Sequence, residues 1–343
     1  MKAMVLEEIS SIEDRPLKLR ELPVPEPGPG EIRIKVGVCG ACHTELDEIE
    51  GRLPPLLPVI PGHQVVGIVD SLGAGAGRFR TGDRVGIAWI YSACGECEFC
   101  RAGNENLCPE FQGTGCDAHG GYAEYAVVSE KFAYPIPGAF SDAQAAPLLC
   151  AGAIGYRALR LTGLGDGQVL GLFGFGASAH IVIQVAKHKF PQCQVYVFTR
   201  PGQKEHQDLA RKLGADWVGA TDDTPPRSLH CAIDFTPAWT PIVEALRVLE
   251  KGGRVVVNAI RKEATDQEAL LGLDYSRHLW HEKELKSVAN IARRDAEEFL
   301  LLAAEIPIAP EVSEFSLEEA NDVLISLKHG KVRGAAVLRI SQG

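Results

Sequence analysis

The first 150 or so residues carry short apolar stretches that alternate with turn signals. Apolar stretches occupy residues 32–38, 65–69 and 84–88. The breaks between them are rich in glycine and proline, at 25–30, 61–62, 73–77 and 82–83. Strands at this spacing predict a compact antiparallel barrel or sandwich in this part of the chain.

From about residue 151 the pattern changes to buried strands that alternate with helices. Apolar runs predict strands at 169–173, 195–199, 232–235 and 254–259. Helical periodicity predicts helices at 177–189, 203–213 and 242–249, the second ending at Gly214 and the third stopped by Gly252 and Gly253. This alternation is typical of βαβ units around a parallel sheet. Beyond about residue 290 the pattern predicts helices at 296–304 and 317–327 and a last strand at 335–340.

Length and charge narrow the class of protein. The 343 residues suffice for two domains. The 45 acidic residues outnumber the 35 lysines and arginines, which form no basic cluster, so nucleic acid is excluded as a partner. Because there is no secretory signal and no run of about 18 apolar residues, we expect a cytoplasmic protein that spans no membrane. In that reducing compartment the 10 cysteines serve as metal ligands or catalytic groups more often than as disulfides.

The most specific local signal is a run of cysteines that ends at Cys108 and also holds Cys94, Cys97 and Cys100. Four thiolates at such short spacings can close around one tetrahedral Zn²⁺ and leave no position for a substrate, which predicts a structural site. Two alternatives remain open, a group of free surface thiols and an iron–sulfur cluster, because four cysteines also suit the latter.

A glycine-rich segment predicts a dinucleotide site. Gly174-Phe175-Gly176-Ala177-Ser178-Ala179 follows a predicted strand, opens a predicted helix and fits the pattern G-x-G-x-x-G/A. The glycines allow a tight turn and a close approach of the pyrophosphate, and the small last residue lets helix and strand pack together. The positive end of the helix dipole then faces the phosphates. The alternative is a tight turn without a ligand.

The end of the second strand of this unit bears on the choice of cofactor. Enzymes that prefer NAD usually carry an acidic residue there, which binds the ribose 2′-hydroxyl. This chain has Thr199 and Arg200 instead, and an arginine can pair with a 2′-phosphate. We therefore predict a preference for NADP(H) over NAD(H), the alternative being that Arg200 is a solvated loop residue.

Taken together, the chain resembles the zinc-dependent alcohol dehydrogenases of the medium-chain dehydrogenase/reductase superfamily over essentially its whole length. The resemblance rests on the four-cysteine run and, in chain order, on residues 37–46, 61–63, 82–86, 120–125 and 146–152. It implies an α/β protein with a GroES-like β-rich catalytic domain and a Rossmann domain, a doubly wound parallel sheet that binds the cofactor. The catalytic domain would comprise residues 1–151 and 291–343, with a structural zinc lobe at about 92–110, and the Rossmann domain residues 152–290.

The same resemblance implies roles for individual residues. Cys42, His63 and Cys150 fall on the ligands of a catalytic zinc, a set that leaves a fourth position open. The four cysteines of the lobe fall on the ligands of a second, structural zinc. Thr44 falls on the hydroxyl that relays a proton, although it could also be the N-cap of a helix. His43 falls on a contact to the cofactor pyrophosphate.

The implied reaction interconverts an alcohol and its aldehyde or ketone, with Thr44 taking the proton and NAD(P) taking the hydride. A dedicated NADPH aldehyde reductase and a non-catalytic nucleotide-binding relative are the alternatives. The expected partners are the small-molecule substrate and further copies of the chain, as a dimer or tetramer. Trp89 and Leu53 fall on the substrate pocket, and because Leu53 stands where yeast-like members have tryptophan, we expect larger primary or aromatic alcohols.

Several positions depart from the family pattern. The usual relay histidine is Asp47, so the proton path would pass through water or Glu50. Gln64 replaces the glutamate that usually follows the zinc histidine, which removes one negative charge near the metal. Glu45 replaces a family aspartate, a conservative change. Ala335 replaces an arginine that often meets the pyrophosphate.

Overall fold

The computed structural model describes residues 1–306 and 308–341, and the chain in it forms two compact units. Unit 1 comprises residues 1–150 together with the described residues from 291 onward, and unit 2 comprises residues 151–290. None of the helices in the described part combines the length and the apolar character that crossing a bilayer requires.

Unit 1 is built on a sheet in which the strand order is β16-β17-β3-β4-β5-β9, with β8 also paired to β3. Its strands are β3 (Glu31–Ala41), β4 (Gln64–Leu72), β5 (Arg84–Ile87), β8 (Tyr125–Ser129), β9 (Ala133–Pro135), β16 (Val312–Ser316) and β17 (Ala335–Arg339). All pairs are antiparallel except β16–β17. In the first part of β3, inward side chains alternate with outward ones, the period-2 pattern that predicted this strand.

The end of the chain returns to this sheet. β17 pairs with β3, with Leu338 opposite Cys39 and Val337 opposite Gly40. Unit 1 also contains two small antiparallel sheets of two strands each. One pairs β1 (Lys2–Leu6) with β2 (Leu17–Glu21), and the other pairs β6 (Ile90–Ser92) with β7 (Gln112–Gly113). The helices of unit 1 are α1 (His43–Ile49), α2 (Glu98–Arg101), α3 (Asp142–Pro147), α8 (Arg293–Glu305) and α9 (Ala320–Lys328).

Unit 2 is a parallel sheet with the strand order β12-β11-β10-β13-β14-β15. Its strands are β10 (Val169–Phe173), β11 (Gln194–Thr199), β12 (Trp217–Ala220), β13 (Leu229–Asp234), β14 (Leu249–Val257) and β15 (Glu284–Ser287). The helices are α4 (Ala153–Thr162), α5 (Ala177–Lys189), α6 (Lys204–Lys212) and α7 (Thr240–Val248). This is the Rossmann order, and the predicted fold class is confirmed.

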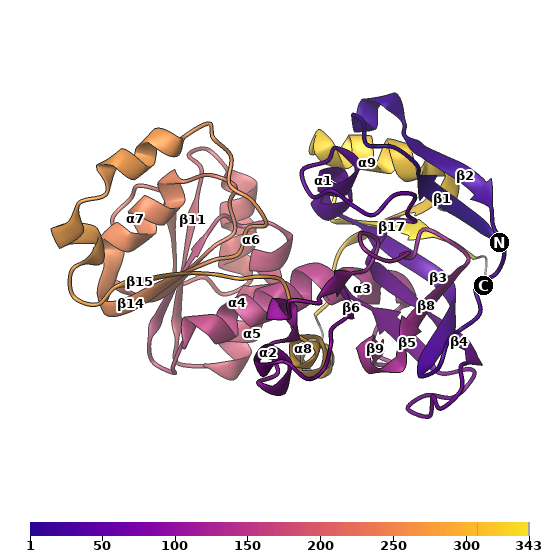
Figure 1. Ribbon diagram of the computed structural model, residues 1–343. Coiled ribbons are helices and arrows are strands. Elements are labelled where there is room, and N and C mark those ends of the chain that lie inside the picture. Colours follow the sequence, from indigo (N-terminus) through magenta and orange to yellow (C-terminus); the bar gives the residue numbers. More distant parts are fainter. Residues whose placement is uncertain (307, 342–343) are drawn as a thin grey trace. The chain divides into compact units, whose positions relative to one another are not determined.

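The chain starts this sheet at its centre and winds outward in both directions. From β10 it passes through α5 to β11 on one side, and later through α7 from β13 to β14 on the other. Right-handed crossovers therefore place α5 and α7 on opposite faces of the sheet, as Figure 1 shows. Every residue of β10 is buried, as expected of a strand covered on both faces.

One boundary prediction in unit 2 is wrong. Gly252 and Gly253 do not stop a helix, because α7 already ends at Val248 and β14 begins at Leu249 and contains both glycines. Gly252 has a φ of +69°, which glycine adopts without strain. A Cβ on Gly253 would lie 2.9 Å from the carbonyl oxygen of Glu250. The glycines thus let β14 pass an irregularity in its pairing with β13.

Candidate active site

Helix α1 begins at a potential metal ligand. Cys42 is its N-cap, and the Cys42 Sγ accepts a hydrogen bond of 3.3 Å from the backbone N–H of Thr44. Glu45 completes a capping box, since its Oε2 accepts a 2.8 Å bond from the backbone N–H of Cys42. Thr44 is therefore not the N-cap, because the thiol group fills that role and Thr44 lies inside the first turn. The bond to the Cys150 thiol, together with burial, raises the pKa of the Cys42 thiol well above its ordinary value, so a bound cation would be needed to hold the thiolate form.

The second donor is held by the same glutamate. The Nδ1 atom of His63 lies 2.6 Å from Oε1 of Glu45, and both side chains are buried. Burial raises the pKa of Glu45, but the neighbouring His63 outweighs it and holds this pKa below its ordinary value. The Nε2 atom of His63 faces the Cys42 Sγ at 3.7 Å. Because the Glu45 carboxylate holds Nδ1 of His63, the Nε2 atom points toward the Cys42 Sγ, the orientation expected of a metal ligand.

Cys150 completes this group. It lies in the turn Leu148–Gly152 that follows α3, and the ligand atoms of Cys42, His63 and Cys150 all lie within 4.8 Å of one another. The group contains no fourth protein donor in the described part of the chain. Two thiolates, one imidazole and an open position are the donor set of a catalytic zinc site, so the residues fit the zinc that the resemblance implies.

The four cysteines of the lobe form the second group. The Cys94 Sγ lies 3.8 Å from the Cys100 Sγ and 3.5 Å from the Cys108 Sγ. Four sulfurs around one Zn²⁺ at ~2.3 Å would be ~3.8 Å apart in a tetrahedron. Backbone N–H groups bond to these sulfurs, for example Cys97 N to the Cys94 Sγ at 3.3 Å, and lower the pKa of Cys94 to about 7. The spacing suits one ion and is too short to enclose a cluster of several irons.

In unit 2 the glycine-rich segment links β10 to α5. Gly174 has a φ of +81°, and a Cβ there would lie 2.8 Å from Cγ2 of Thr236. Gly176 is the N-cap of α5 without any side-chain cap, and a Cβ built on it meets no atom within 4 Å. The first N–H groups of α5 are thus left for another acceptor, with space for a phosphate beside them. Ala179 is buried, as the close packing of helix and strand requires.

Thr199 and Arg200, which bear on the choice of cofactor, lie at the end of β11 and directly after it. Thr199 is buried, and its Oγ1 accepts a 3.0 Å bond from Nε2 of Gln207 on α6. Arg200 is exposed in the turn that follows, with its backbone N–H bonded to Gln203. No acidic side chain stands at either position.

Comparisons with known proteins agree with this geometry. Residues 28–138 match the family model of the alcohol dehydrogenase GroES-like domain. A probable alcohol dehydrogenase AdhA from Mycobacterium tuberculosis is 43% identical over 331 residues, covering 95% of this chain and 93% of that protein. An alcohol dehydrogenase from Geobacillus stearothermophilus is 33% identical, and the match covers 100% of both chains. The chain belongs to the alcohol dehydrogenase family.

A solved structure supports the fold of this alcohol dehydrogenase over its length. The cobalt- and zinc-bound thermostable alcohol dehydrogenase from Pyrobaculum aerophilum is 25% identical, with a TM-score of 0.85 and 99% of each chain covered. The predicted family, fold class and alcohol dehydrogenase activity are confirmed by these relatives.

The remaining predicted site residues of unit 1 differ in how the structure places them. Trp89 is buried and meets the His63 ring edge-on, with ring centroids 5.3 Å apart, so it forms an apolar wall beside the metal donors. His43 is the exposed first residue of α1. Leu53 is half-buried in the loop after α1, with its N–H bonded to the Asp47 carbonyl. Ala335 begins β17, and the neighbouring Arg333 is ion-paired with Glu311.

The residue at the usual relay position belongs to a network of ion pairs. Asp47 is buried and lies 2.5 Å from Nε of Arg52, whose other nitrogen contacts Glu50. Glu50 also bonds to Lys328 of α9 at 2.8 Å. Burial raises the pKa of Glu50, but the bonds from Lys328 and Arg52 prevail and lower it to about 2. Glu50 therefore stays charged near neutrality, and the expectation that it carries the proton loses its support.

Sequence reasoning missed Glu48, which lies one turn after Glu45 on the same face of α1. Glu48 is fully buried, and neither carboxylate oxygen has a hydrogen-bond partner among the described residues. Burial, and then the negative charge of Glu45, raise its pKa well above the ordinary value. The spacing of three residues from Glu45 was the only signal of this position in the sequence.

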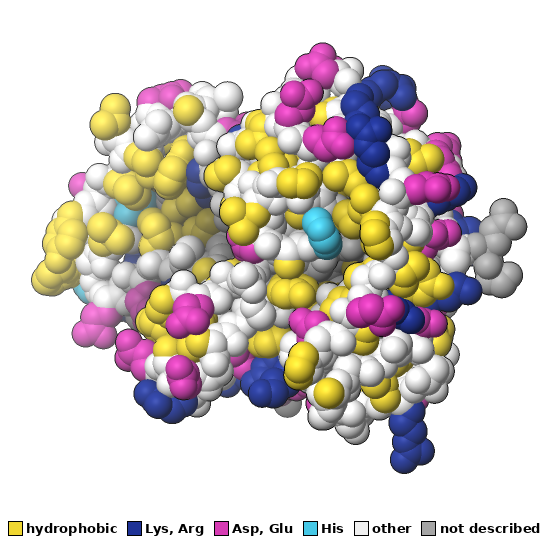
Figure 2. Space-filling model, turned by 45° about the vertical axis from the view of Figure 1, so that its right-hand side comes forward, with side chains coloured by type: hydrophobic (Ala, Val, Ile, Leu, Met, Phe, Trp, Pro, Cys, Tyr) yellow, Lys and Arg dark blue, Asp and Glu magenta, His cyan; other side chains and the backbone are white. Residues whose placement is uncertain are grey.

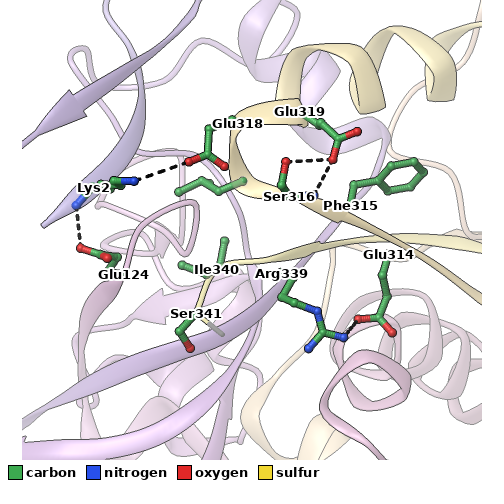
Figure 3. A pocket seen from close by; sticks show the side chains of 11 residues that line it. Lys2, Glu124, Glu314, Phe315, Ser316, Glu318, Glu319, Arg339, Ile340 and Ser341 are labelled. Carbon is green, nitrogen blue, oxygen red and sulfur yellow. Dashed lines mark hydrogen bonds and ion pairs between the residues drawn. The ribbon is translucent and has the colours of Figure 1, made fainter. Parts of the chain in front are cut away.

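A separate hollow of about 460 Å³ lies on unit 1 (Figure 3). It is lined from β1, β16, β17 and the turn after β16, and none of the metal donors reaches it. Its two basic side chains are each paired with a glutamate, Arg339 with Glu314 and Lys2 with Glu318, and two further glutamates line it, Glu124 and Glu319. Because it is lined by none of the metal donors and by no part of the glycine-rich segment, this hollow is not the candidate active site.

Glu48 of α1 and Glu50, which directly follows α1, predict opposite pH effects on stability. The raised pKa of Glu48 means that the folded protein binds this proton more tightly than the unfolded chain, so its contribution to stability falls as pH rises above about 4.5. We expect Glu48→Gln to raise the free energy of unfolding by about 1–3 kcal/mol at pH 8 and by less at pH 5. Urea unfolding of the variant and of the unaltered protein at both pH values measures this difference in the free energy of unfolding.

Glu50→Gln is the matched control. The pKa of Glu50 is lowered to about 2, so its stabilisation is present above about pH 4.5 and is lost as pH falls toward 2. This variant is expected to destabilise the protein at pH 8. If Glu48→Gln destabilises the protein at pH 8 in the same way, the account of Glu48 is wrong.

Proposed function

We propose that this alcohol dehydrogenase interconverts an alcohol and its aldehyde or ketone at a zinc ion held by Cys42, His63 and Cys150, with NAD(P) bound at the Gly174–Ala179 segment. The observation that carries the proposal is the convergence of three donor atoms within 4.8 Å, one of them oriented by a buried glutamate. A zinc ion held by these three donors would polarise the substrate oxygen as a Lewis acid and would make an alcohol proton easier to remove.

The chain's own residues supply orientation and proton handling. Glu45 fixes the ring of His63 and, through the backbone of Cys42, the start of α1. The bond between the N–H of Thr44 and the Cys42 Sγ fixes the backbone of Thr44 beside the donors. We assign its hydroxyl the role of holding the substrate proton. Trp89 covers one side of His63 and excludes water there.

The lobe cysteines would hold a second zinc, which makes two per chain. All four ligand positions are filled by sulfur, so this ion would stabilise the lobe and take no part in the chemistry. The lobe contacts α8 through an ion pair of 2.8 Å between Glu105 and Arg293.

For the substrate, we propose larger primary or aromatic alcohols and the corresponding aldehydes. Trp89 offers an apolar aromatic surface, and Leu53 is smaller than the tryptophan of yeast-like members. A substrate panel in which only ethanol-sized alcohols react would oppose this proposal.

We also propose that the protein is a cytoplasmic homo-oligomer, a dimer or tetramer. None of the ten cysteines is in a disulfide, which suits a reducing compartment. On unit 2, β15 is an exposed edge strand, and the segment before it exposes Leu271, Tyr275 and Trp280. Apolar surface beside an open sheet edge suits a second copy. On the face in Figure 2, acidic and basic side chains are interspersed, with no basic field for nucleic acid.

Arg200 supports NADP(H) as the preferred cofactor, and with it a second candidate function, an NADPH-dependent aldehyde reductase. The exposed guanidinium at the end of β11 can pair with a 2′-phosphate, and no acidic side chain at 199 or 200 would repel it. Kinetics in both directions separate this candidate from an alcohol-oxidising enzyme.

Metal content and activity together test the proposed function. We expect two zinc ions per chain by mass spectrometry in the active protein. Cys42→Ser should retain one zinc and lose at least about 100-fold in kcat/KM, because the catalytic donor set is broken. Cys100→Ser is the matched control and should also retain one zinc, but with a Tm lowered by several degrees. Activity of Cys42→Ser equal to that of the unaltered enzyme would refute the assignment.

A second test addresses the cofactor. We expect Arg200→Ala to lower kcat/KM for NADP(H) by about 10–100-fold, the loss of one charge-assisted hydrogen bond, and to leave kcat/KM for NAD(H) unchanged. Arg211→Ala, on the exposed face of α6, is the control. Equal or better efficiency of the unaltered enzyme with NAD(H) would contradict the preference.

A further inference from the structure

A lysine of unit 2 is buried at the carboxyl edge of the sheet. Lys262 follows β14, and its side chain is only 10% exposed. Its Nζ contacts the carboxylate of Asp234, the last residue of β13, and donates to the carbonyl oxygens of Thr236 and Ala238, each at 2.8 Å. These three acceptors match the three N–H donors of an ammonium group, so Lys262 has none left for a ligand.

The loop that Lys262 holds lies beside the glycine-rich turn. Asp234 is opposite Phe173 in the parallel pairing of β13 with β10, and the N–H of Phe235 donates to the Phe173 carbonyl at 2.9 Å. Thr236 then forms the wall against which Gly174 packs, since a Cβ on that glycine would lie 2.8 Å from its Cγ2. The loop thus borders the point where strand order reverses, which is where such sheets bind ligands.

Asp234 and Lys262 fix the shape of this loop jointly. The Oδ1 atom of Asp234 accepts bonds from the N–H and the hydroxyl of Thr236, at 3.0 and 2.8 Å, while its other oxygen meets Lys262. Asp234 is fully buried. Without the ammonium group, Oδ2 of Asp234 and the Thr236 carbonyl would lose this donor, and the Ala238 carbonyl would keep only the 3.4 Å bond from the Thr236 hydroxyl, in a site of low polarity.

The residues after Lys262 hold the rest of the loop. The N–H of Glu263 donates to the Pro237 carbonyl at 2.8 Å. Asp266 accepts bonds from the N–H groups of Trp239 and Thr240 and from the Thr240 hydroxyl at 2.8 Å. Residues 262–266 therefore cross the loop from the end of β13 to the start of α7.

We propose that Lys262 is a positioning residue for the dinucleotide, because it holds the β13–α7 loop against the Gly174 turn in the form that the cofactor meets. The inference rests on the proposed cofactor site. It assigns Lys262 no contact with the cofactor. Its consequence is that loss of Lys262 weakens cofactor binding through the loop and leaves the metal donors of unit 1 unaffected.

The test compares Lys262→Met with Lys283→Met in the zinc-loaded protein. Lys283 is a matched control, since its Nζ also bonds to two backbone carbonyls, of Leu246 and Arg277, outside this loop. Dissociation constants for NADP(H) and NAD(H) are measured by titration calorimetry, with Tm and zinc content alongside. We expect Lys262→Met to raise both constants about tenfold and Lys283→Met to change only the Tm.

Hydrogen exchange gives a readout that does not need the cofactor. The amides of Thr236, Trp239 and Thr240 should lose protection in Lys262→Met and keep it in Lys283→Met, and Lys262→Arg should restore part of it. If Lys262→Met proves too unstable to purify, Asp266→Asn serves as the second variant, with the same expected changes. Unchanged dissociation constants in a folded variant would overturn the inference alone. Failure of the unaltered protein to bind either dinucleotide would overturn the proposed cofactor site as well.

Discussion

The carboxylate of Glu45 is the constraint on which the candidate active site depends. One of its oxygens accepts the backbone N–H of Cys42 at 2.8 Å, and the other lies 2.6 Å from Nδ1 of His63. Cys42 directly follows β3 and His63 directly precedes β4. The pairing of Gly40 with Gln64 brings these two strand ends together. Sheet pairing thus sets the approach of the donors, and one buried carboxylate sets their orientation.

In unit 2, too, strand pairing brings the segments together and a buried acid fixes their shape. Parallel pairing brings the ends of β10 and β13 to one edge of the sheet, where the Gly174 turn and the following loop meet. A buried ion pair between Asp234 and Lys262 then fixes the loop. In each unit a fully buried acid fixes the shape of the neighbouring backbone: Glu45 in the first turn of α1 and Asp234 at the end of β13. Each thereby positions the groups that would face a ligand.

Local sequence patterns predicted the parts of this protein that depend on neighbouring residues. Strand 169–173 and helix 177–189 were predicted at their observed bounds, because their apolar periodicity and their glycines are local. Features that depend on contacts distant in sequence were missed. Gly252 was read as a helix stop, although its role arises from the pairing of β14 with β13. The burial of Glu48 and the partners of Lys262 likewise follow from packing that periodicity does not encode.

The most direct measurement is zinc retention under competition with a chelator, comparing Glu45→Gln with Glu105→Gln, which alters a buried glutamate of the four-cysteine lobe. If Glu45 orients His63, Glu45→Gln should release one zinc per chain at about 10–100-fold lower chelator concentration and hold the other as the unaltered protein does. Glu105→Gln should leave the zinc of the Cys42 group in place. Release of both ions from Glu45→Gln at the same chelator concentrations as from the unaltered protein would contradict the account.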